Sequence, residues 1–556
     1  MNLRCFSRCL SSFVLTFLLA DAARAGLPTP DPDNGAITLP PGFRALVVAD
    51  NLGPLRFMTV APSGDIYVKK TNGGVVALRD TKGDGRADVI TSFGSGAGTG
   101  VAVHDGYLYY STNDEVFRYK LNPGELVPSG EAENIVTGLP WQDEHESKAF
   151  AFDPEGNLYV EVGCPSNGSG NPDRGLGAKG VDPSELFQRH GSFWKFKSDV
   201  QGQEQKDGTR FGFGFRHILA VAWQPLSKSF FTVQMGRDQL NTVDPVDFTA
   251  GQNAELPAEE MHLLTEHSNF GWPFTYYDPM QKARMLSPEF GGDGKKRAEP
   301  GKYEDPLVAF PAHWAPMQMT FYTGTQFPEK YRNGAFIAFH GSWNRAPWPQ
   351  AGYNVTFVPF DQKGMPTGSY EIFANNFKGA PVIMSPDDAR FRPCGIAMGP
   401  DGSLYVSDSE KGRVWRIIYA GDTTQPIAAA SATTSTSPTP APLSDSLAAG
   451  AKIYLENCAS CHQVDGSGVP NMQPALKNDP ILSGDPKTLI QTVLKGPAAV
   501  LPADRPHYSN TMPPFARLSD DQIALLLTYL RHQYGNAASA IDAKQVAAQR
   551  PPPQAD

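Results

Sequence analysis

The stretch IAMGPDGSLYVSDSEKGRVWRI, residues 396–417, runs from one apolar segment through an Asp-Gly turn into a second segment of alternating side chains. Three further stretches follow the same order: MTVAPSGDIYVKK from residue 58, VAVHDGYLYYSTND from residue 101 and FAFDPEGNLYVEVG from residue 150. Turns of this kind supply the positive φ angles that tight hairpins need. Each stretch therefore predicts a β-hairpin.

Two more diverged stretches, VAWQPLSKSFFTVQ from residue 221 and AFIAFHGSWNR from residue 335, extend this series to six. A single hairpin sheet cannot bury its own faces, so units repeated at tens of residues predict blades stacked around a ring. We expect an all-β six-bladed propeller over residues 26–420, with a seven-bladed ring as the alternative. The long interval between the last two diverged stretches is expected to hold loops inserted over one rim.

Length and composition favour a globular protein of more than one domain. The chain has 556 residues, of which 40% are hydrophobic and 19% are charged, and it includes 54 Gly and 49 Pro. One hydrophobic core rarely serves a chain of this length. The net charge of −10 and the absence of a Lys/Arg cluster argue against nucleic acid as a partner.

Residues 1–25 have the order of an export signal. Arg4 and Arg8 precede the mostly apolar CLSSFVLTFLLA, and Ala-Arg-Ala follows at residues 23–25. The alternative is a membrane anchor, but the apolar stretch is too short to span a bilayer. No later segment reaches spanning length, so we expect a mature protein without a membrane span, located in the periplasm.

The chain after the propeller divides into three parts. Residues 421–444 are rich in Ala, Thr, Ser and Pro without apolar periodicity, which is typical of a flexible linker. Residues 445–535 show helical spacing of apolar residues, and Ser519 with Gln522 forms a capping-box pattern before one of these helices. This predicts a small all-α domain. Residues 536–556 are rich in Ala, Gln and Pro and are expected to be disordered.

Within this α domain, Cys458-Ala459-Ser460-Cys461-His462 has the spacing of a covalent haem site. The thiols of Cys458 and Cys461 would form the two thioethers, and His462 would be the proximal iron ligand. Met512, in a Pro-stiffened segment before the last helix, is the expected sixth ligand, with Met472 as the competitor. An iron with both axial positions filled by protein carries electrons and does not bind substrate.

Two cysteines remain once the export signal and the haem motif are set aside. Cys164 and Cys394 are separated by 230 positions, as their numbers show. An exported protein folds in an oxidising compartment, where a disulfide between them is plausible. The alternative is a pair of buried thiols, and the sequence leaves both open.

Ordered motifs along the propeller resemble one known family. No G-x-G-x-x-G opens a βαβ unit, so a nicotinamide or Rossmann-bound flavin is not expected. The chain resembles the soluble sugar dehydrogenases that use pyrroloquinoline quinone (PQQ), the glucose, sorbosone and pyranose dehydrogenases, and its C-terminal part resembles the cytochrome c domains of periplasmic alcohol and sugar dehydrogenases. The propeller motifs are LPWQDEHESKAFAFDPEGNLYVEVG, FGFGFRHILAVAW, NFGWPF, FHGSWNRAP and FRPCGIAMGPDGSLYVSD.

The resemblance implies roles for five residues. His145 matches the loop histidine that takes the proton of the anomeric hydroxyl, a role that suits an imidazole at neutral pH. Arg216, Arg345 and Arg392 fall in family-like motifs and would bind the carboxylates of PQQ through their bidentate guanidinium groups. His217 stands where the glucose enzymes carry Asn, next to the cofactor.

The resemblance also implies calcium, which that family holds through main-chain carbonyls after the fourth-blade strand. Here those positions are Gly236 and Arg237, and Glu260 is a weaker candidate for a second ion. Hard oxygen donors of this kind suit calcium.

These expectations combine into one hypothesis. The chain is expected to be a periplasmic enzyme that oxidises a sugar through PQQ and passes the electrons to its own haem, and then to a soluble cytochrome or a respiratory-chain component. Two alternatives stay open. One is a propeller lactonase, which would need acidic calcium ligands in the funnel, and the other is a non-catalytic propeller that carries an electron-transfer cytochrome.

Overall fold

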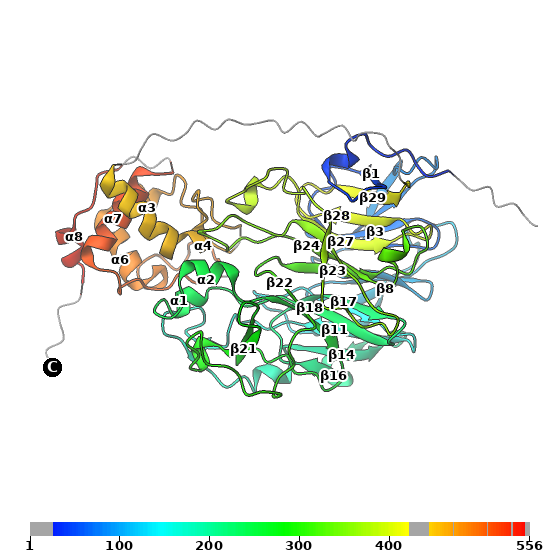
Figure 1. Cartoon of the computed structure of the whole chain (residues 1–556), viewed down its shortest axis with the longest axis horizontal. Coiled ribbons are helices and arrows are strands. Elements are labelled where there is room, and N and C mark those ends of the chain that lie inside the picture. The colour runs from blue at the N-terminus through cyan, green and yellow to red at the C-terminus, as the bar shows by residue number, and fades with distance from the viewer. Residues whose placement is uncertain (1–25, 422–443, 471, 509, 535–537, 551–556) are drawn as a thin grey trace, which may run out of the picture.

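The computed structural model describes residues 26–421, 444–470, 472–508, 510–534 and 538–550. The predicted export signal and linker residues 422–443 lie outside the described residues. The described chain forms a β-propeller followed by a helical domain, which lies against one end of the propeller (Figure 1).

The propeller has six blades, each built on four antiparallel strands, as the repeated hairpins predict. Its innermost strands β2, β6, β10, β17, β23 and β27 each contact the next around the ring. From the inside outward, the blades are β2–β5 (Leu55–Val60, Ile66–Lys70, Val75–Arg79, Val89–Phe93), β6–β9 (Val101–His104, Tyr107–Ser111, Val116–Lys120, Glu133–Thr137), β10, β11, β14 and β16 (Phe150–Phe152, Asn157–Val162, Ser192–Lys197, Thr209–Phe213), β17, β18, β19 and β22 (Ile218–Gln224, Ser229–Gln234, Glu259–Leu264, Val308–Phe310), β23–β26 (Pro316–Phe321, Ala335–Phe339, Asn354–Val358, Glu371–Ala374), and β27, β28, β29 and β1 (Pro393–Met398, Leu404–Asp408, Val414–Tyr419, Phe43–Ala49).

The two ends of the propeller chain meet in the last blade. Its outermost strand, β1, comes from the N-terminal side and pairs with β29 in a register that joins Phe43 to Tyr419. Neighbouring blades share buried apolar clusters, such as the one in which Val68 of the first blade lies with Tyr405 of the last. The last blade therefore closes the ring by combining strands from both ends of the propeller chain.

The insertions gather where the sequence predicts rim loops. The interval between β18 and β23 contains α1 (Leu240–Val243), α2 (Ala250–Glu255) and the hairpin of β20 (Thr275–Asp278) and β21 (Ala283–Leu286). Shorter strands β12 (Gly170–Asn171), β13 (Lys179–Gly180) and β15 (Gln203–Glu204) extend other loops. Helices α1 and α2 lie on the side of the propeller that faces the helical domain (Figure 1).

The helical domain places α3 (Asp445–Asn457) against α7 (Asp520–His532), with α4 (Ala459–His462), α5 (Pro480–Ser483) and α6 (Pro486–Lys495) around them. Helix α8 (Ala543–Ala547) packs on α7, and Ile541 and Val546 are buried in the domain's apolar cluster. The prediction of a disordered tail is therefore wrong for residues 538–550. The interpretation based on its Ala- and Gln-rich composition overlooked a capping box formed by Asp542 and Gln545.

Direct contacts hold the helical domain on the propeller. The Gln463 Nε2 atom donates to the Trp343 carbonyl at 2.7 Å, and the hydroxyls of Ser385 and Ser467 lie 3.0 Å apart. Ala346 of the propeller is fully buried within the apolar cluster of the helical domain. The haem-attachment segment thus faces the propeller and not solvent alone.

Candidate functional site

A cavity of about 500 Å³ opens on the propeller face that meets the helical domain. Its walls come from loops that precede innermost strands and follow second strands, and antiparallel pairing brings all these loops to the same face. Met472 and His507 of the helical domain complete the wall. The charged and histidine residues from the propeller are Arg56, Asp143, Glu144, His145, Glu146, Arg174, Arg216, His217, Asp238, Glu259, His313, His340 and Arg392.

His145 lies in the cavity wall, in the loop before β10. Its Nδ1 atom lies 2.5 Å from the Cys164 carbonyl, so Nδ1 carries the proton and donates it. Burial lowers the pKa of His145 well below 6.5, and the positive charge of Arg216 acts in the same direction. The imidazole is therefore neutral at neutral pH, with Nε2 available as a proton acceptor.

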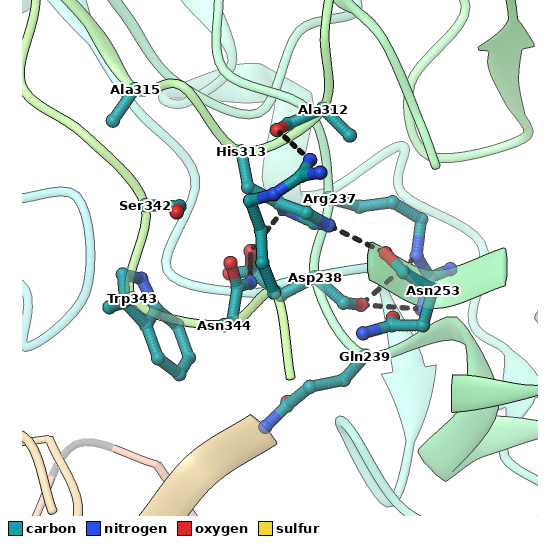
Figure 2. A network of polar contacts seen from close by, with 12 residues as sticks. Arg237, Asp238, Gln239, Asn253, Ala312, His313, Ala315, Ser342, Trp343 and Asn344 are labelled. Atoms are coloured by element: carbon teal, nitrogen blue, oxygen red, sulfur yellow. Dashed lines mark hydrogen bonds and ion pairs between the residues drawn. The ribbon is translucent and has the colours of Figure 1, made fainter. Parts of the chain in front are cut away.

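Asp238 is the centre of a polar network on the cavity wall (Figure 2). Its Oδ2 atom accepts from Arg216 Nη2 at 2.6 Å, and Oδ1 accepts from Asn344 Nδ2 at 2.6 Å. His313 Nδ1 lies 3.5 Å from Oδ1. Although burial opposes ionisation, the charge of Arg216 and the His313 hydrogen bond hold the pKa of Asp238 well below 3.8. The network thus contains a fixed anion that orients Arg216.

Four arginines line the cavity, and the sequence pointed to two of them. Arg216 and Arg392 are where the resemblance places them, whereas Arg56 and Arg174 were missed. Arg174 stands in a loop rich in Gly, Ser and Asn, and its own φ is 59°. Nothing in that loop's pattern distinguishes its arginine from a solvated one.

The structure places Arg345 outside the cavity. Its Nη1 atom donates to the carbonyls of Ala254 at 2.7 Å and Ala312 at 3.2 Å. The prediction that Arg345 binds a cofactor carboxylate is not supported by this position. The neighbouring Asn344 lines the cavity in its place.

The expected calcium position is only partly built for a cation. The Gly236 carbonyl lines the cavity and accepts from Arg216 Nη1 at 3.1 Å, while the Gly236 N–H donates to Glu259 Oε2 at 2.7 Å. The Arg237 side chain pairs with Glu289, away from the cavity. Within the described ranges, no three His, Cys, Asp or Glu side chains converge as metal ligands, so a calcium ion here would depend on main-chain carbonyls together with Glu259.

Glu260 does not offer a second ion site. Its Oε2 atom accepts from Arg284 Nη2 at 2.5 Å and lies 3.0 Å from His262 Nε2. The carboxylate is thus used by a buried arginine and a histidine behind the cavity wall.

His217 lies beside His145, with ring centroids 5.0 Å apart. Its Nδ1 atom lies 3.1 Å from Glu161 Oε1, which also accepts from the Ile218 N–H at 3.1 Å. His217 is therefore held by the blade behind it, with its ring in the cavity wall. Cys164 and Cys394 are separate, buried, free thiols, which is the second of the two alternatives.

The haem motif has the surroundings that an iron ligand needs. His462 Nδ1 lies 3.0 Å from the Pro474 carbonyl, which fixes the proton on Nδ1 and leaves Nε2 for the iron. Met512 packs against the apolar cluster of the helical domain, which also includes Cys458. Met472 instead lines the propeller cavity. These positions favour Met512 as the sixth ligand, which stays a prediction.

Comparison with known proteins agrees with both parts of the fold. Residues 37–420 match the TrAA12-like family, and residues 447–533 match the cytochrome c family. A PQQ-dependent pyranose dehydrogenase from Coprinopsis cinerea is 29% identical over 189 residues, which cover 29% of this chain and 25% of that protein. The cytochrome c subunit of an alcohol dehydrogenase (quinone) from Gluconobacter oxydans is 36% identical over 91 residues, which cover 16% of this chain and 19% of the subunit.

A solved structure confirms the propeller fold. The carbohydrate-active enzyme of family AA12 from Trichoderma reesei superposes with a TM-score of 0.57 at 20% identity, over 69% of this chain and 98% of that one. The matches span a quarter or less of the length of the two relatives named above. No helix within the described residues is long and apolar enough to cross a membrane.

Proposed function

Because the chain belongs to the TrAA12-like family and carries a cytochrome c domain, we propose that it is an exported sugar dehydrogenase that uses PQQ. It passes the electrons from the sugar to its own haem c. The observation that carries this proposal is the cavity itself, in which arginines and a neutral histidine share a wall with residues of the haem-bearing domain.

The cavity residues fit a small polyanion such as PQQ, which has three carboxylates. The guanidinium groups of Arg56, Arg174, Arg216 and Arg392 come from four separate blades or their loops. The Arg216 Nε atom is buried without a hydrogen-bond partner among the described residues. A buried N–H without a partner is costly, so a carboxylate oxygen from a bound anion would relieve that cost.

When bound, PQQ would supply a two-electron oxidant able to take a hydride from the sugar carbon. The chain's own contribution to this reaction is acid–base chemistry and orientation. His145 Nε2 takes the hydroxyl proton, while the Cys164 carbonyl holds the Nδ1 proton and so fixes the tautomer. Asp238 keeps Arg216 in one orientation, and Gly236 with Glu259 provides oxygen donors for calcium.

The proposal is tested by reconstitution of the purified full chain with PQQ and calcium chloride. Haem absorption bands are followed after addition of single aldoses from a panel. We expect reduction of the haem by at least one sugar, and no reduction without PQQ. A parallel sample reduced by dithionite reports how much haem is competent.

Other outcomes would identify the alternatives. Hydrolysis of an added lactone without haem reduction would support the lactonase. The proposal is overturned if dithionite reduces the haem, no sugar does, and no lactone is hydrolysed. That result would support the non-catalytic propeller.

A further inference from the structure

We infer that Gln239 and Arg174 form the bridge by which electrons pass from the propeller cavity to the haem. This inference rests on the proposed function, because it needs an electron donor in the cavity. Gln239 lies next to Asp238 in the chain, and its side chain extends away from the Asp238 network to the ribbon of the helical domain (Figure 2).

The Gln239 amide makes hydrogen bonds in both directions. Its Nε2 atom donates to Cys461 Sγ at 2.8 Å, across the boundary between the two domains. Its Oε1 atom accepts from Arg174 Nη1 at 2.9 Å. Covalent attachment converts the Cys461 thiol to a thioether, whose sulfur keeps its lone pairs and still accepts a hydrogen bond. One side chain thus joins the haem-bearing sulfur to a cavity arginine.

Arg174 continues the path into the cavity wall. Its Nη2 atom pairs with Glu144 Oε2 at 2.7 Å, and Nη1 lies 3.6 Å from Asp238 Oδ2. Asp238 in turn binds Arg216 at 2.6 Å. The path from the Cys461 sulfur to the cavity therefore runs through bonds and hydrogen bonds, which couple donor and acceptor better than a gap of equal length.

The backbone at Gln239 is held in an uncommon conformation for this contact. Its φ is 61°, in the left-handed region that non-glycine residues rarely adopt, and the residue is only 2% exposed. Such conformations persist where the surroundings fix them, often at functional sites. Asn241 Nδ2 also donates across the boundary, to the Glu456 carbonyl at 3.4 Å, and this bond involves neither Arg174 nor Asp238.

The electron count sets what this bridge must carry. Oxidation of a sugar hydroxyl to a carbonyl releases a pair of electrons and two protons. One proton would go to His145, and the other would leave the carbon with the electron pair as hydride and pass to solvent once both electrons have moved to the haem. Ferric haem takes one electron at a time. Each sugar therefore requires two passages over the bridge, each followed by reoxidation of ferrous haem by an external one-electron acceptor.

The first measurement compares two rates in PQQ-loaded protein. One is the rate of haem reduction by sugar in stopped flow, and the other is sugar oxidation with an external dye that bypasses the haem. We expect Gln239→Leu to lower the ratio of the first rate to the second by about tenfold or more, and Gln239→Glu to lower it less, because Glu keeps the acceptor for Arg174. Asn241→Ala, the matched interdomain control, should leave the ratio unchanged.

The second measurement needs no PQQ. A hydrogen bond to the thioether sulfur tunes the haem, so Gln239→Leu and Gln239→Glu should both lower its reduction potential, whereas Asn241→Ala should not. Small-angle scattering reports whether each variant keeps the docked dimensions.

An unchanged rate ratio in Gln239→Leu, an equal fall in Asn241→Ala, or an unshifted potential would overturn the bridge. A parental protein that reduces neither dye nor haem with sugar would overturn the proposed function first, and the bridge with it.

Discussion

At the scale of single residues, the environment of His145 sets a pH dependence. Burial and the nearby Arg216 charge lower its pKa well below 6.5, and a base with a lowered pKa stays unprotonated to more acidic pH. We expect kcat/KM for the sugar, measured with an external dye, to stay level from pH 8 to pH 6.5 and to fall only below that range. His145→Ala should lose the acid limb together with about 10²-fold or more of the rate.

His190 provides the control for this prediction. It also has a lowered pKa, chiefly from burial, and its Nδ1 lies 3.1 Å from the Gly163 carbonyl, but it does not line the cavity. His190→Gln should therefore keep the parental pH profile. An acid limb centred above pH 6.5, or one that survives in His145→Ala, contradicts the role of His145.

Glu259 makes a different prediction, about calcium. Burial raises its pKa to about 7, although the N–H groups of Gly236 and Ala315 donate to it. In the unfolded state Glu259 loses its proton above pH 4.5, whereas in the folded state it keeps the proton up to about pH 7. Without calcium, the free energy of unfolding therefore falls as the pH rises from 4.5 through about 7. A cation that needs the ionised carboxylate reverses this loss at higher pH.

We therefore expect calcium chloride to raise the Tm of the PQQ-free protein more at pH 8 than at pH 5.5, and chelation to remove the difference. Magnesium at equal concentration is the control, since it prefers octahedral coordination that includes several waters. Equal shifts at both pH values would show that calcium does not bind through Glu259.

The positions of some cavity residues could be predicted from the sequence and those of others could not, for a physical reason. His145, Arg216 and Arg392 stand beside recognisable strand patterns, so their positions at one rim follow once the ring closes. Arg174 comes from an irregular loop, and only the fold brings it to Asp238. Arg345 stands in the right motif, but local backbone carbonyls bind its guanidinium instead.

At the scale of secondary-structure elements, the capping box of α7 is testable. Ser519 accepts from the Gln522 N–H at 3.1 Å, as the sequence predicts, whereas Ser444 at the start of α3 makes no side-chain capping bond. Ser519→Ala should lower the free energy of unfolding of the helical domain by about 1 kcal/mol. Ser444→Ala should cost much less. Urea unfolding followed by haem absorption measures both, and equal losses would contradict the assignment.

The hairpins show how far local patterns reach. Asp401-Gly402 and Glu155-Gly156 form turns in which both glycines have positive φ, so their hairpins could be located from sequence. In the fifth blade, residues 322–334 separate the innermost strand Pro316–Phe321 from its partner β24, so no tight turn joins the two strands. The sequence repeat indicates only the second strand of this blade, and the position of the first strand is evident only in the closed ring.

At the scale of the whole molecule, the domain order could be predicted and the docking could not. The sequence predicts a tether long enough to reach any face of the propeller, whereas the contacts that select one face, such as Gln463 with Trp343, join residues far apart in sequence. The chosen face is the one that holds the cavity. Met472 and His507 of the cytochrome domain form part of the cavity wall, so the docked domain occupies one side of the cavity that holds His145.

This arrangement predicts that the domains must separate for substrate exchange. Ser385 and Ser467 face each other across the boundary with their Oγ atoms 3.0 Å apart, so cysteine sulfurs at these positions would have to approach by about 1 Å to form a disulfide of roughly 2 Å. In the Ser385→Cys and Ser467→Cys double variant, oxidation should lower dye-coupled sugar turnover by about tenfold or more, since closure then becomes permanent. Mild reduction followed by removal of the reductant should restore it.

Ser385→Cys alone is the control for thiol chemistry, and it should respond to neither treatment because Cys164 and Cys394 are buried. The locked protein keeps Gln239 against Cys461, so a substrate already inside should still reduce the haem in a single turnover. If the oxidised double variant turns over sugar at the parental rate, the cavity has a second opening, and the cytochrome serves as an electron acceptor without gating the site.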